Sequence, residues 1–307
     1  MPAGRVMVTG AAGLLGQKII DVFKRESEYE LHACDLSGGI DGYFSLDITD
    51  RQRVLDVVRA ISPSVIINAA AFTDVDRAEV DRELAYKVNA TAVDYLAEAA
   101  FLFGAKMVHI STDYVFNGLK GNYDENSVPD PISYYGKSKL AGENLLRARL
   151  ENHAILRTQV LYGFGKSIKK NFVLWVLEKL SNKEKFSVVT DQIGNPTLAD
   201  ELAIAVLKVV QRDAKGLYNV SGVQSLSRFD FAKAVAEVFG IDPSGMSPTT
   251  TDRLNQRARR PTNSSFICLK AQTELGLTVP SVRDSLYFMR QQMKVAGVFQ
   301  PATKTIS

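Results

Sequence analysis

Gly10-Ala-Ala-Gly13-Leu-Leu-Gly16 sets the architecture of the whole chain. It follows an apolar, strand-like run over residues 5–9 and precedes a helical pattern over 14–25. In that context Gly10 permits a tight turn, Gly13 lets backbone N–H groups approach a pyrophosphate, and Gly16 allows close packing of the helix on the strand. The pattern predicts a dinucleotide site that also includes Leu14 and Leu15. A glycine-rich turn with a purely structural role is the alternative.

Strand-like runs and helical patterns alternate along the first half of the chain. The runs cover 31–35, 65–69, 106–110 and 154–158, and the helical patterns cover 51–61, 82–103 and 134–150. Such alternation implies right-handed crossovers and a parallel sheet covered on both faces. We therefore predict an α/β protein with a Rossmann-type doubly wound parallel sheet and a smaller C-terminal α/β lobe.

Beyond residue 158 the pattern is looser. It predicts helices over 171–180, 199–211 and 227–239, with Ser227 as the N-cap of the last one, strands over 186–189 and 216–220, and a loop over 243–251. We expect a dinucleotide-binding domain that consists of residues 1–157 and also includes 187–222. The substrate-binding lobe is expected over 158–186 and 223–294, and a flexible tail over 295–307.

Composition excludes several classes of function. The 307 residues carry 46% hydrophobic residues and a net charge of +3, too small to indicate nucleic acid as a partner. Cys34 and Cys268 indicate neither a disulfide framework nor a metal site, and no histidines have ligand spacing. The absence of a signal peptide or of a long apolar run predicts a cytoplasmic protein with no membrane partner.

Acidic and small residues follow the second and third strand-like runs. Asp35 stands 19 residues after Gly16, the offset of an acid that hydrogen-bonds the adenosine ribose, so NADH should be accepted while NADPH stays open. Asp47 and Ile48 are expected against the adenine, although a helix-capping role is equally compatible. Small residues at a strand end let a cofactor approach the backbone, and here these are Ala69, Ala70 and Ala71.

Thr112, Tyr135 and Lys139 form the candidate catalytic set. Thr112 ends a predicted strand, and Tyr135 and Lys139 lie four residues apart on the next helix, hence on one face. Reduction of a ketone needs a proton donor and a hydrogen bond that polarises the carbonyl. We expect Tyr135 to donate the proton, with its pKa lowered by the Lys139 ammonium and the nicotinamide charge, and Thr112 to polarise the carbonyl. An ordinary surface pair is the alternative for Tyr135 and Lys139.

In this order the residues resemble the extended short-chain dehydrogenase/reductase superfamily, and within it the dTDP-4-dehydrorhamnose reductase family. The matching stretches cover 68–79, 111–116, 134–143, 191–197 and 259–264. The resemblance implies reduction of the 4-keto group of a nucleotide-linked deoxysugar by NADPH or NADH, and it permits a homodimer. It assigns the sugar nucleotide as substrate, with Asp113 near the sugar.

The same resemblance implies that Arg259 and Arg260 bind the diphosphate of the sugar nucleotide, with a solvated basic turn as the alternative. It also exposes a departure, because Val160 stands where the family usually has a tryptophan that packs on the sugar. Loss of the indole removes aromatic contact area and should open the pocket.

Two other functions fit the same residues. An epimerase or dehydratase of this superfamily would use its cofactor transiently, but Asp113-Tyr114 stands where the dehydratase acid pair is expected. A regulatory subunit resembling the beta subunit of methionine adenosyltransferase also lacks the tryptophan. In that case the dinucleotide would serve structure or sensing, since a fold does not determine a function.

Overall fold

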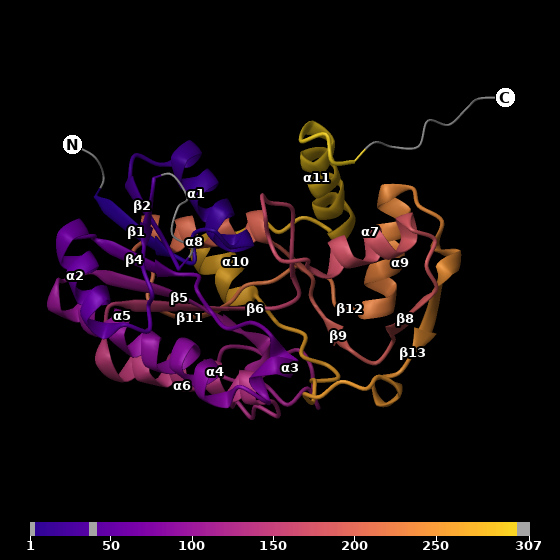
Figure 1. Cartoon of the computed structure of the whole chain (residues 1–307), viewed down its shortest axis with the longest axis horizontal. Helices are drawn as coiled ribbons and strands as arrows, with labels where there is room; N and C mark the ends of the chain where they lie inside the picture. Colours follow the sequence, from indigo (N-terminus) through magenta and orange to yellow (C-terminus); the bar gives the residue numbers. More distant parts are fainter. Residues whose placement is uncertain (1–3, 37–41, 300–307) are drawn as a thin grey trace.

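A parallel sheet forms the centre of the larger part of the molecule (Figure 1). The computed structural model describes residues 4–36 and 42–299. Within them the strand order is β11-β6-β5-β4-β1-β2-β3, and every neighbouring pair is parallel. The strands are β1 (Arg5–Thr9), β2 (Glu30–Asp35), β3 (Tyr43–Ser45), β4 (Val65–Asn68), β5 (Lys106–Thr112), β6 (His153–Thr158) and β11 (Gly216–Asn219). The order reverses between β1 and β4, the point at which doubly wound sheets bind ligands.

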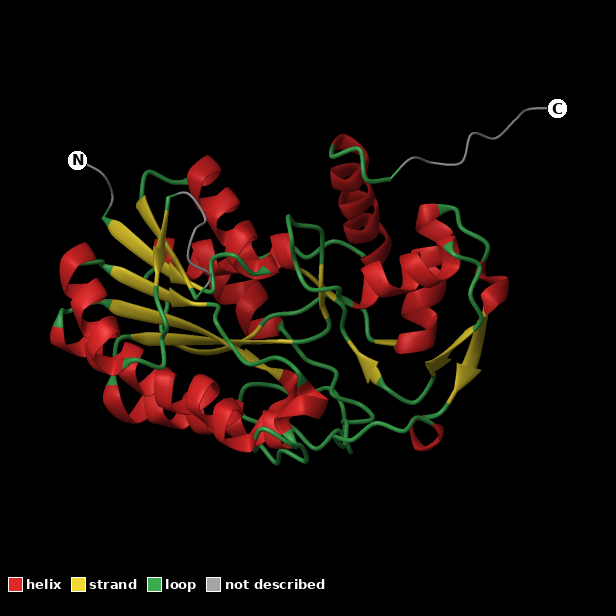
Figure 2. Cartoon of the chain, viewed as in Figure 1, coloured by secondary structure: helices red, strands yellow, loops and turns green. Residues whose placement is uncertain are grey.

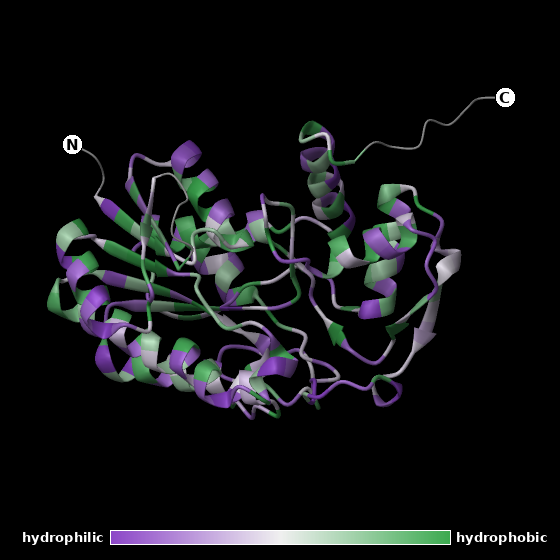
Figure 3. Ribbon diagram, viewed as in Figure 1, coloured by the Kyte–Doolittle hydropathy of each residue, from purple (hydrophilic) through white to green (hydrophobic). Residues whose placement is uncertain are grey.

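Helices cover both faces of the sheet (Figure 2). One layer contains α1 (Leu14–Glu26), α8 (Ala199–Gln211) and α10 (Leu269–Leu275), and the other contains α2 (Arg51–Ile61), α5 (Ala92–Leu102) and α6 (Tyr134–Arg149). Both faces of the sheet are therefore buried, and in Figure 3 its strands carry many hydrophobic residues, interrupted by hydrophilic ones. The predicted Rossmann-type fold is confirmed.

Alternation along β1 supplies both layers of the core. Val6 and Val8 pack with α1 and α8, whereas Met7 packs on the opposite side with α2 and α5. Successive side chains of a strand point to opposite faces, so a single apolar run fills two layers. The sheet edge that carries the carboxyl ends of the strands is left to irregular, more polar segments.

The smaller lobe has its own apolar core. It contains α7 (Phe172–Ser181), α9 (Arg228–Phe239) and α11 (Val282–Val295), together with β8 (Phe186–Val189). The loop predicted over 243–251 is wrong, because β13 (Met246–Thr249) lies in it and pairs with β8 in parallel. A strand so short and rich in Ser, Thr and Pro carries no apolar alternation that could reveal it. Two further short pairs join β7 (Leu161–Tyr162) to β10 (Thr197–Leu198) and β9 (Ile193–Gly194) to β12 (Leu226–Ser227).

The helix predicted over 82–103 is interrupted. It consists of α4 (Arg82–Tyr86), a π-helical segment (Lys87–Thr91) and α5, and the short α3 (Val75–Ala78) precedes it. Inside the π segment, Asn89 donates to the Ser138 hydroxyl at 3.0 Å and accepts from the Phe72 N–H at 2.9 Å. Its amide thus ties the loop after β4 to α6, a role that apolar periodicity does not encode.

The end of the described chain is packed. Val295 is the last residue of α11, and the Phe299 ring meets Phe239 edge-on with centroids 5.1 Å apart. The rest of the predicted tail, 300–307, lies outside the described residues. Over the part of the chain that the structure describes, every helix is too short or too polar to cross a membrane.

Candidate active site

The glycine turn is closed by backbone contacts. Gly10 has a φ of +69°, and a Cβ placed on it would lie 2.6 Å from the Ala70 backbone nitrogen. A Cβ on Gly16 would lie 2.2 Å from the Gly10 carbonyl oxygen, so neither position accepts a side chain without a shift. Gly13 is the N-cap of α1 and offers no side-chain cap, which leaves the first backbone N–H groups of the helix open to an anion.

The residues predicted around the adenosine lie beside this turn. An Asp35 carboxylate oxygen accepts the Ala12 N–H at 2.9 Å, which places the acid against the glycine turn. Asp47 accepts the Thr49 N–H and hydroxyl at 2.8 Å each, in the turn that precedes α2, and the N-cap of that helix is Asp50. Ile48 is buried in the core layer under α2 and α5. The remaining predicted residues of this group are Leu14 and Leu15 on α1 and Ala69, Ala70 and Ala71 after β4.

Thr112 and Tyr135 meet at the end of β5. The Thr112 side chain accepts the Tyr114 N–H at 3.2 Å and forms a hydrogen bond with Tyr135. The Tyr135 ring packs edge-on against Tyr114 with centroids 5.5 Å apart. Ser133 caps α6 by accepting the Gly136 N–H at 3.1 Å, so the helix begins at the point that brings Tyr135 to the strand end.

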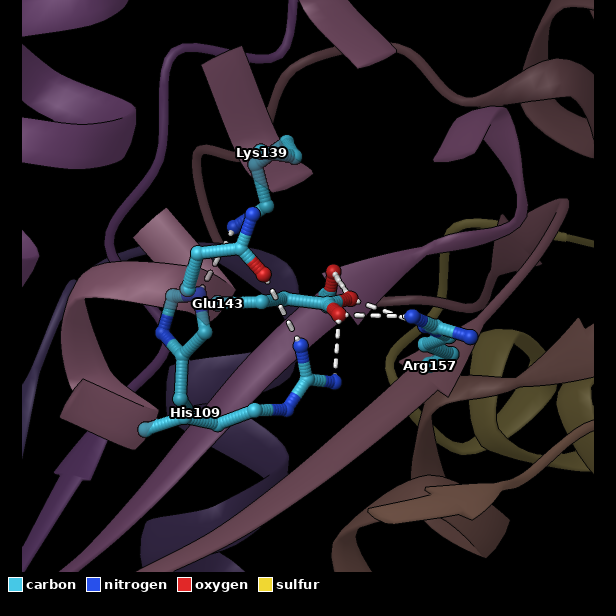
Figure 4. A network of polar contacts seen from close by, with 7 residues as sticks. His109, Lys139, Glu143 and Arg157 are labelled. Atoms are coloured by element: carbon cyan, nitrogen blue, oxygen red, sulfur yellow. Dashed lines mark hydrogen bonds and ion pairs between the residues drawn. The ribbon is translucent and has the colours of Figure 1, made fainter. Parts of the chain in front are cut away.

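Lys139 lies one helical turn beyond Tyr135 and is only 2% exposed. Its ammonium donates to the Ile110 carbonyl at 2.7 Å and lies 3.4 Å from the His109 ring (Figure 4). His109 in turn contacts the Asn68 amide at 3.1 Å. Burial lowers the pKa of Lys139 to about 8, although the charge of Glu143 acts in the opposite direction.

The expected lowering of the Tyr135 pKa is not a property of the protein alone. Burial raises the pKa of Tyr135 above its ordinary value, and the hydrogen bond with Thr112 opposes this rise only in part. The Lys139 ammonium is directed to the Ile110 carbonyl. Tyr135 is therefore a neutral phenol near pH 7, the form that can donate a proton.

A buried carboxylate holds α6 against the sheet. Glu143 accepts two hydrogen bonds from Arg157 on β6, at 2.8 and 2.7 Å, and one from the Ser111 hydroxyl on β5 at 2.5 Å (Figure 4). Arg147 adds a further contact at 2.8 Å. Burial opposes ionisation, but the contacts with Arg157 and Ser111 keep the pKa of Glu143 below its ordinary value. The network fixes the helix that carries Tyr135 and Lys139 relative to Thr112.

A cleft opens between this edge and the smaller lobe. Asp113 lies in its wall, and its carboxylate accepts the hydroxyl protons of Thr112 at 3.1 Å and Ser264 at 2.5 Å. Burial raises the pKa of Asp113. Val160 also lines the cleft and has a φ of +47°, a strained backbone conformation for a β-branched residue.

The two predicted diphosphate arginines differ in their surroundings. Arg260 forms a bidentate ion pair with Asp76, at 3.1 and 2.6 Å, and also donates to the Ala258 carbonyl at 3.0 Å. Its guanidinium is thus largely committed to protein acceptors. Arg259 is exposed.

Several cleft residues were missed by sequence reasoning, namely Tyr114, Gln192, Arg228 and Ser264. Three of them lie within stretches that carry the family resemblance, so that resemblance was the available signal. Arg228 had none, since an arginine after a capping serine is also an ordinary first residue of a helix. Over residues 4–36 and 42–299, acidic, histidine and cysteine side chains form no cluster that could hold a metal ion.

Comparison with known proteins adds independent findings. The family model described as RmlD substrate binding domain matches residues 4–295. The dTDP-4-dehydrorhamnose reductase of Aggregatibacter actinomycetemcomitans is 36% identical over 89% of this chain and 94% of its own length. Methionine adenosyltransferase 2 subunit beta of Xenopus laevis is 31% identical over 94% of this chain and 88% of its own.

Among solved structures, a dTDP-4-dehydrorhamnose reductase from Bacillus anthracis in complex with NADP superimposes with a TM-score of 0.87 at 36% identity, covering 94% of this chain and 99% of that one. A dTDP-4-dehydrorhamnose reductase orthologue from Clostridium acetobutylicum gives a TM-score of 0.88 at 34% identity, with coverages of 94% and 99%. The similarity therefore extends over both the sheet and the smaller lobe.

Proposed function

This chain belongs to the RmlD substrate binding domain family, and we propose that it catalyses the NAD(P)H-dependent reduction of the 4-keto group of a nucleotide-linked deoxysugar, as a dTDP-4-dehydrorhamnose reductase. The observation that carries the proposal is the meeting of Thr112 and Tyr135 at the end of β5, with Lys139 on the next helical turn. These groups lie at the same sheet edge as the glycine turn, where a nicotinamide would be brought to the ketone.

The chain's own residues fit a bound dinucleotide. The uncapped N-terminus of α1 supplies backbone N–H groups for the pyrophosphate, and Gly10 and Gly16 leave no side chain in the turn. Asp35, which accepts the Ala12 N–H, would accept a ribose hydroxyl. The Lys139 ammonium would hold the ribose of the nicotinamide. A bound NAD(P)H supplies the hydride.

The protein side of the reaction is a proton transfer. As the hydride reaches the carbonyl carbon, the C=O electron pair moves to oxygen, and Tyr135 gives that oxygen its phenolic proton. Thr112 stabilises the developing charge through a hydrogen bond, and the Lys139 ammonium stabilises the phenolate that remains. Asp113 and Val160 would contact the sugar from the cleft wall.

The experiment that tests this function follows the hydride itself. We expect deuterium from NADPH labelled at C4 of the nicotinamide to appear at C4 of the sugar, detected by NMR of the product of dTDP-4-keto-6-deoxy-L-mannose. Turnover without label at C4 of the sugar would refute the proposed chemistry.

A regulatory subunit is the second candidate. Its support is the identity of 31% with methionine adenosyltransferase 2 subunit beta over 94% of this chain. Such a protein would form a stoichiometric complex with a synthetase and would not reduce the ketone, whereas the reductase needs no partner for turnover. Size-exclusion chromatography with a methionine adenosyltransferase distinguishes the two.

A further inference from the structure

Arg228 is the first residue of α9, and its side chain lines the cleft together with Asp113 and Tyr114. Its backbone N–H donates to the Gln192 carbonyl at 3.0 Å, which fixes the start of the helix at the cleft wall. The guanidinium lies over the Phe172 ring, 5.4 Å from its centroid. The Phe172 ring thereby makes a cation–π contact with the guanidinium.

The N–H donors of the Arg228 guanidinium have no acceptor in the described part of the protein. Among the described residues, none accepts a hydrogen bond from the Arg228 guanidinium. The other arginines near the site are paired, Arg157 with Glu143 and Arg260 with Asp76. Arg228 is half-buried, and its guanidinium carries five N–H donors that need acceptors. Burial accordingly lowers the pKa of Arg228.

The nearest acid does not offset this charge by direct contact. Asp113 directs its two carboxylate oxygens to Thr112 and Ser264. Burial also raises the pKa of Asp113, which makes its carboxylate a weaker counter-charge. Arg260 is a second cation nearby, but it is paired with Asp76. Among the described residues of the cleft, the Arg228 guanidinium therefore stays without an ion-pair partner, beside Tyr114, whose ring packs against Tyr135.

We propose that Arg228 is the anion-binding residue of the substrate cleft and holds an anionic oxygen group of the nucleotide sugar beside the catalytic edge. The inference rests on the proposed function for the identity of the ligand as a nucleotide sugar. The anion is a phosphate oxygen of the diphosphate or, if the substrate is a sugar acid and not the proposed deoxysugar, a carboxylate on the sugar. A guanidinium fork suits both.

Binding of unreactive ligands tests the proposal without turnover. Dissociation constants of dTDP, thymidine and UDP-glucuronic acid are measured by calorimetry for the wild-type protein, Arg228→Gln and Arg228→Lys, each saturated with NADP. Lys233→Gln is the matched control, because Lys233 lies on the same helix over Phe229 but is exposed. NADP affinity measured in parallel reports whether each variant is folded.

We expect Arg228→Gln to weaken dTDP binding at least tenfold and thymidine binding less than twofold if the anion is the diphosphate. If the anion is a sugar carboxylate, we expect the same variant to bind UDP-glucuronic acid at least tenfold more weakly and dTDP with unchanged affinity. Arg228→Lys should recover part of the loss, and Lys233→Gln should match the wild type. Equal affinities of wild type and Arg228→Gln for dTDP and UDP-glucuronic acid would overturn the proposal. If these affinities are equal but the wild-type protein still reduces the ketone, the role of Arg228 is refuted and the proposed function is retained.

Discussion

The Glu143 carboxylate and the Arg157 guanidinium form a bidentate ion pair, at 2.8 and 2.7 Å, two helical turns beyond Tyr135. Both side chains are at most 1% exposed. Because Glu143 is on α6 and Arg157 on β6, the pair fixes the helix that carries Tyr135, the proposed proton donor, to the sheet whose edge carries Thr112. The geometry of the proposed active site therefore depends on a buried ion pair.

Removing that charge should destabilise the fold. Glu143→Gln leaves the buried Arg157 cation without its counter-charge, and we expect a loss of about 3–5 kcal/mol in the free energy of unfolding. Urea unfolding followed by circular dichroism measures it. The control is Glu237→Gln, which breaks an exposed pair with Arg283 and should cost less than about 1 kcal/mol.

The same pair predicts a pH dependence of stability. The pKa of Glu143 is lowered in the folded protein, so its contribution is fully present above the unfolded pKa of about 4.3 and is lost as the pH falls through the lower folded value. The stability difference between wild type and Glu143→Gln should shrink below about pH 4. A difference that stays constant from pH 7 to pH 3 would contradict this assignment.

Tyr135→Phe removes the proposed proton donor with little change in shape. We expect kcat to fall by about 10²–10⁴-fold while NADPH affinity changes little. Tyr134→Phe is the matched control, since Tyr134 is the neighbouring residue and its ring packs instead under Arg82. Equal losses in both variants would mean that Tyr135 acts through structure.

Lys139 should make cofactor binding depend on pH. Its pKa is lowered to about 8, so the ammonium that would hold the ribose is present below pH 8 and is lost above it. We expect the dissociation constant of NADPH, measured by fluorescence, to rise between pH 7.5 and 9.5. Lys139→Met should bind NADPH more weakly than the wild type at every pH, without the pH dependence. Lys137→Met, which changes an exposed residue on the same helix, should bind NADPH with the pH dependence of the wild type.

Asp35 should limit the use of NADPH. Its carboxylate lies at the glycine turn, where a 2′-phosphate would meet like charge. We expect Asp35→Ala to raise the ratio of kcat/KM for NADPH to that for NADH by about tenfold or more, which corresponds to roughly 1.4 kcal/mol. An unchanged ratio would show that Asp35 does not face the 2′ position.

Local sequence patterns predicted the parts of the fold that depend on local physics. Apolar runs located β1, β4 and β5, the helix over 199–211 has the predicted bounds, and Ser227 caps α9 as expected. The glycine spacing, with its strand before and helix after, located the turn. Each of these signals lies within a few residues of the feature that it predicts.

Features set by distant contacts escaped prediction. The π segment exists where Asn89 reaches Ser138, and β13 exists where it meets β8. The ion pair of Arg260 with Asp76 and the position of Arg228 in the cleft also depend on neighbours that come from distant parts of the chain. Sequence spacing does not predict which arginine stays without an ion-pair partner, because pairing depends on carboxylates from distant parts of the chain.

The most direct test of the central claim is the oxidation of NADPH and NADH, followed by absorbance, with dTDP-4-keto-6-deoxy-L-mannose and with a blank that lacks it. We predict rapid, substrate-dependent oxidation by the wild-type protein that is lost in Tyr135→Phe. Tight cofactor binding without any oxidation above the blank would contradict the reductase assignment and favour the regulatory subunit.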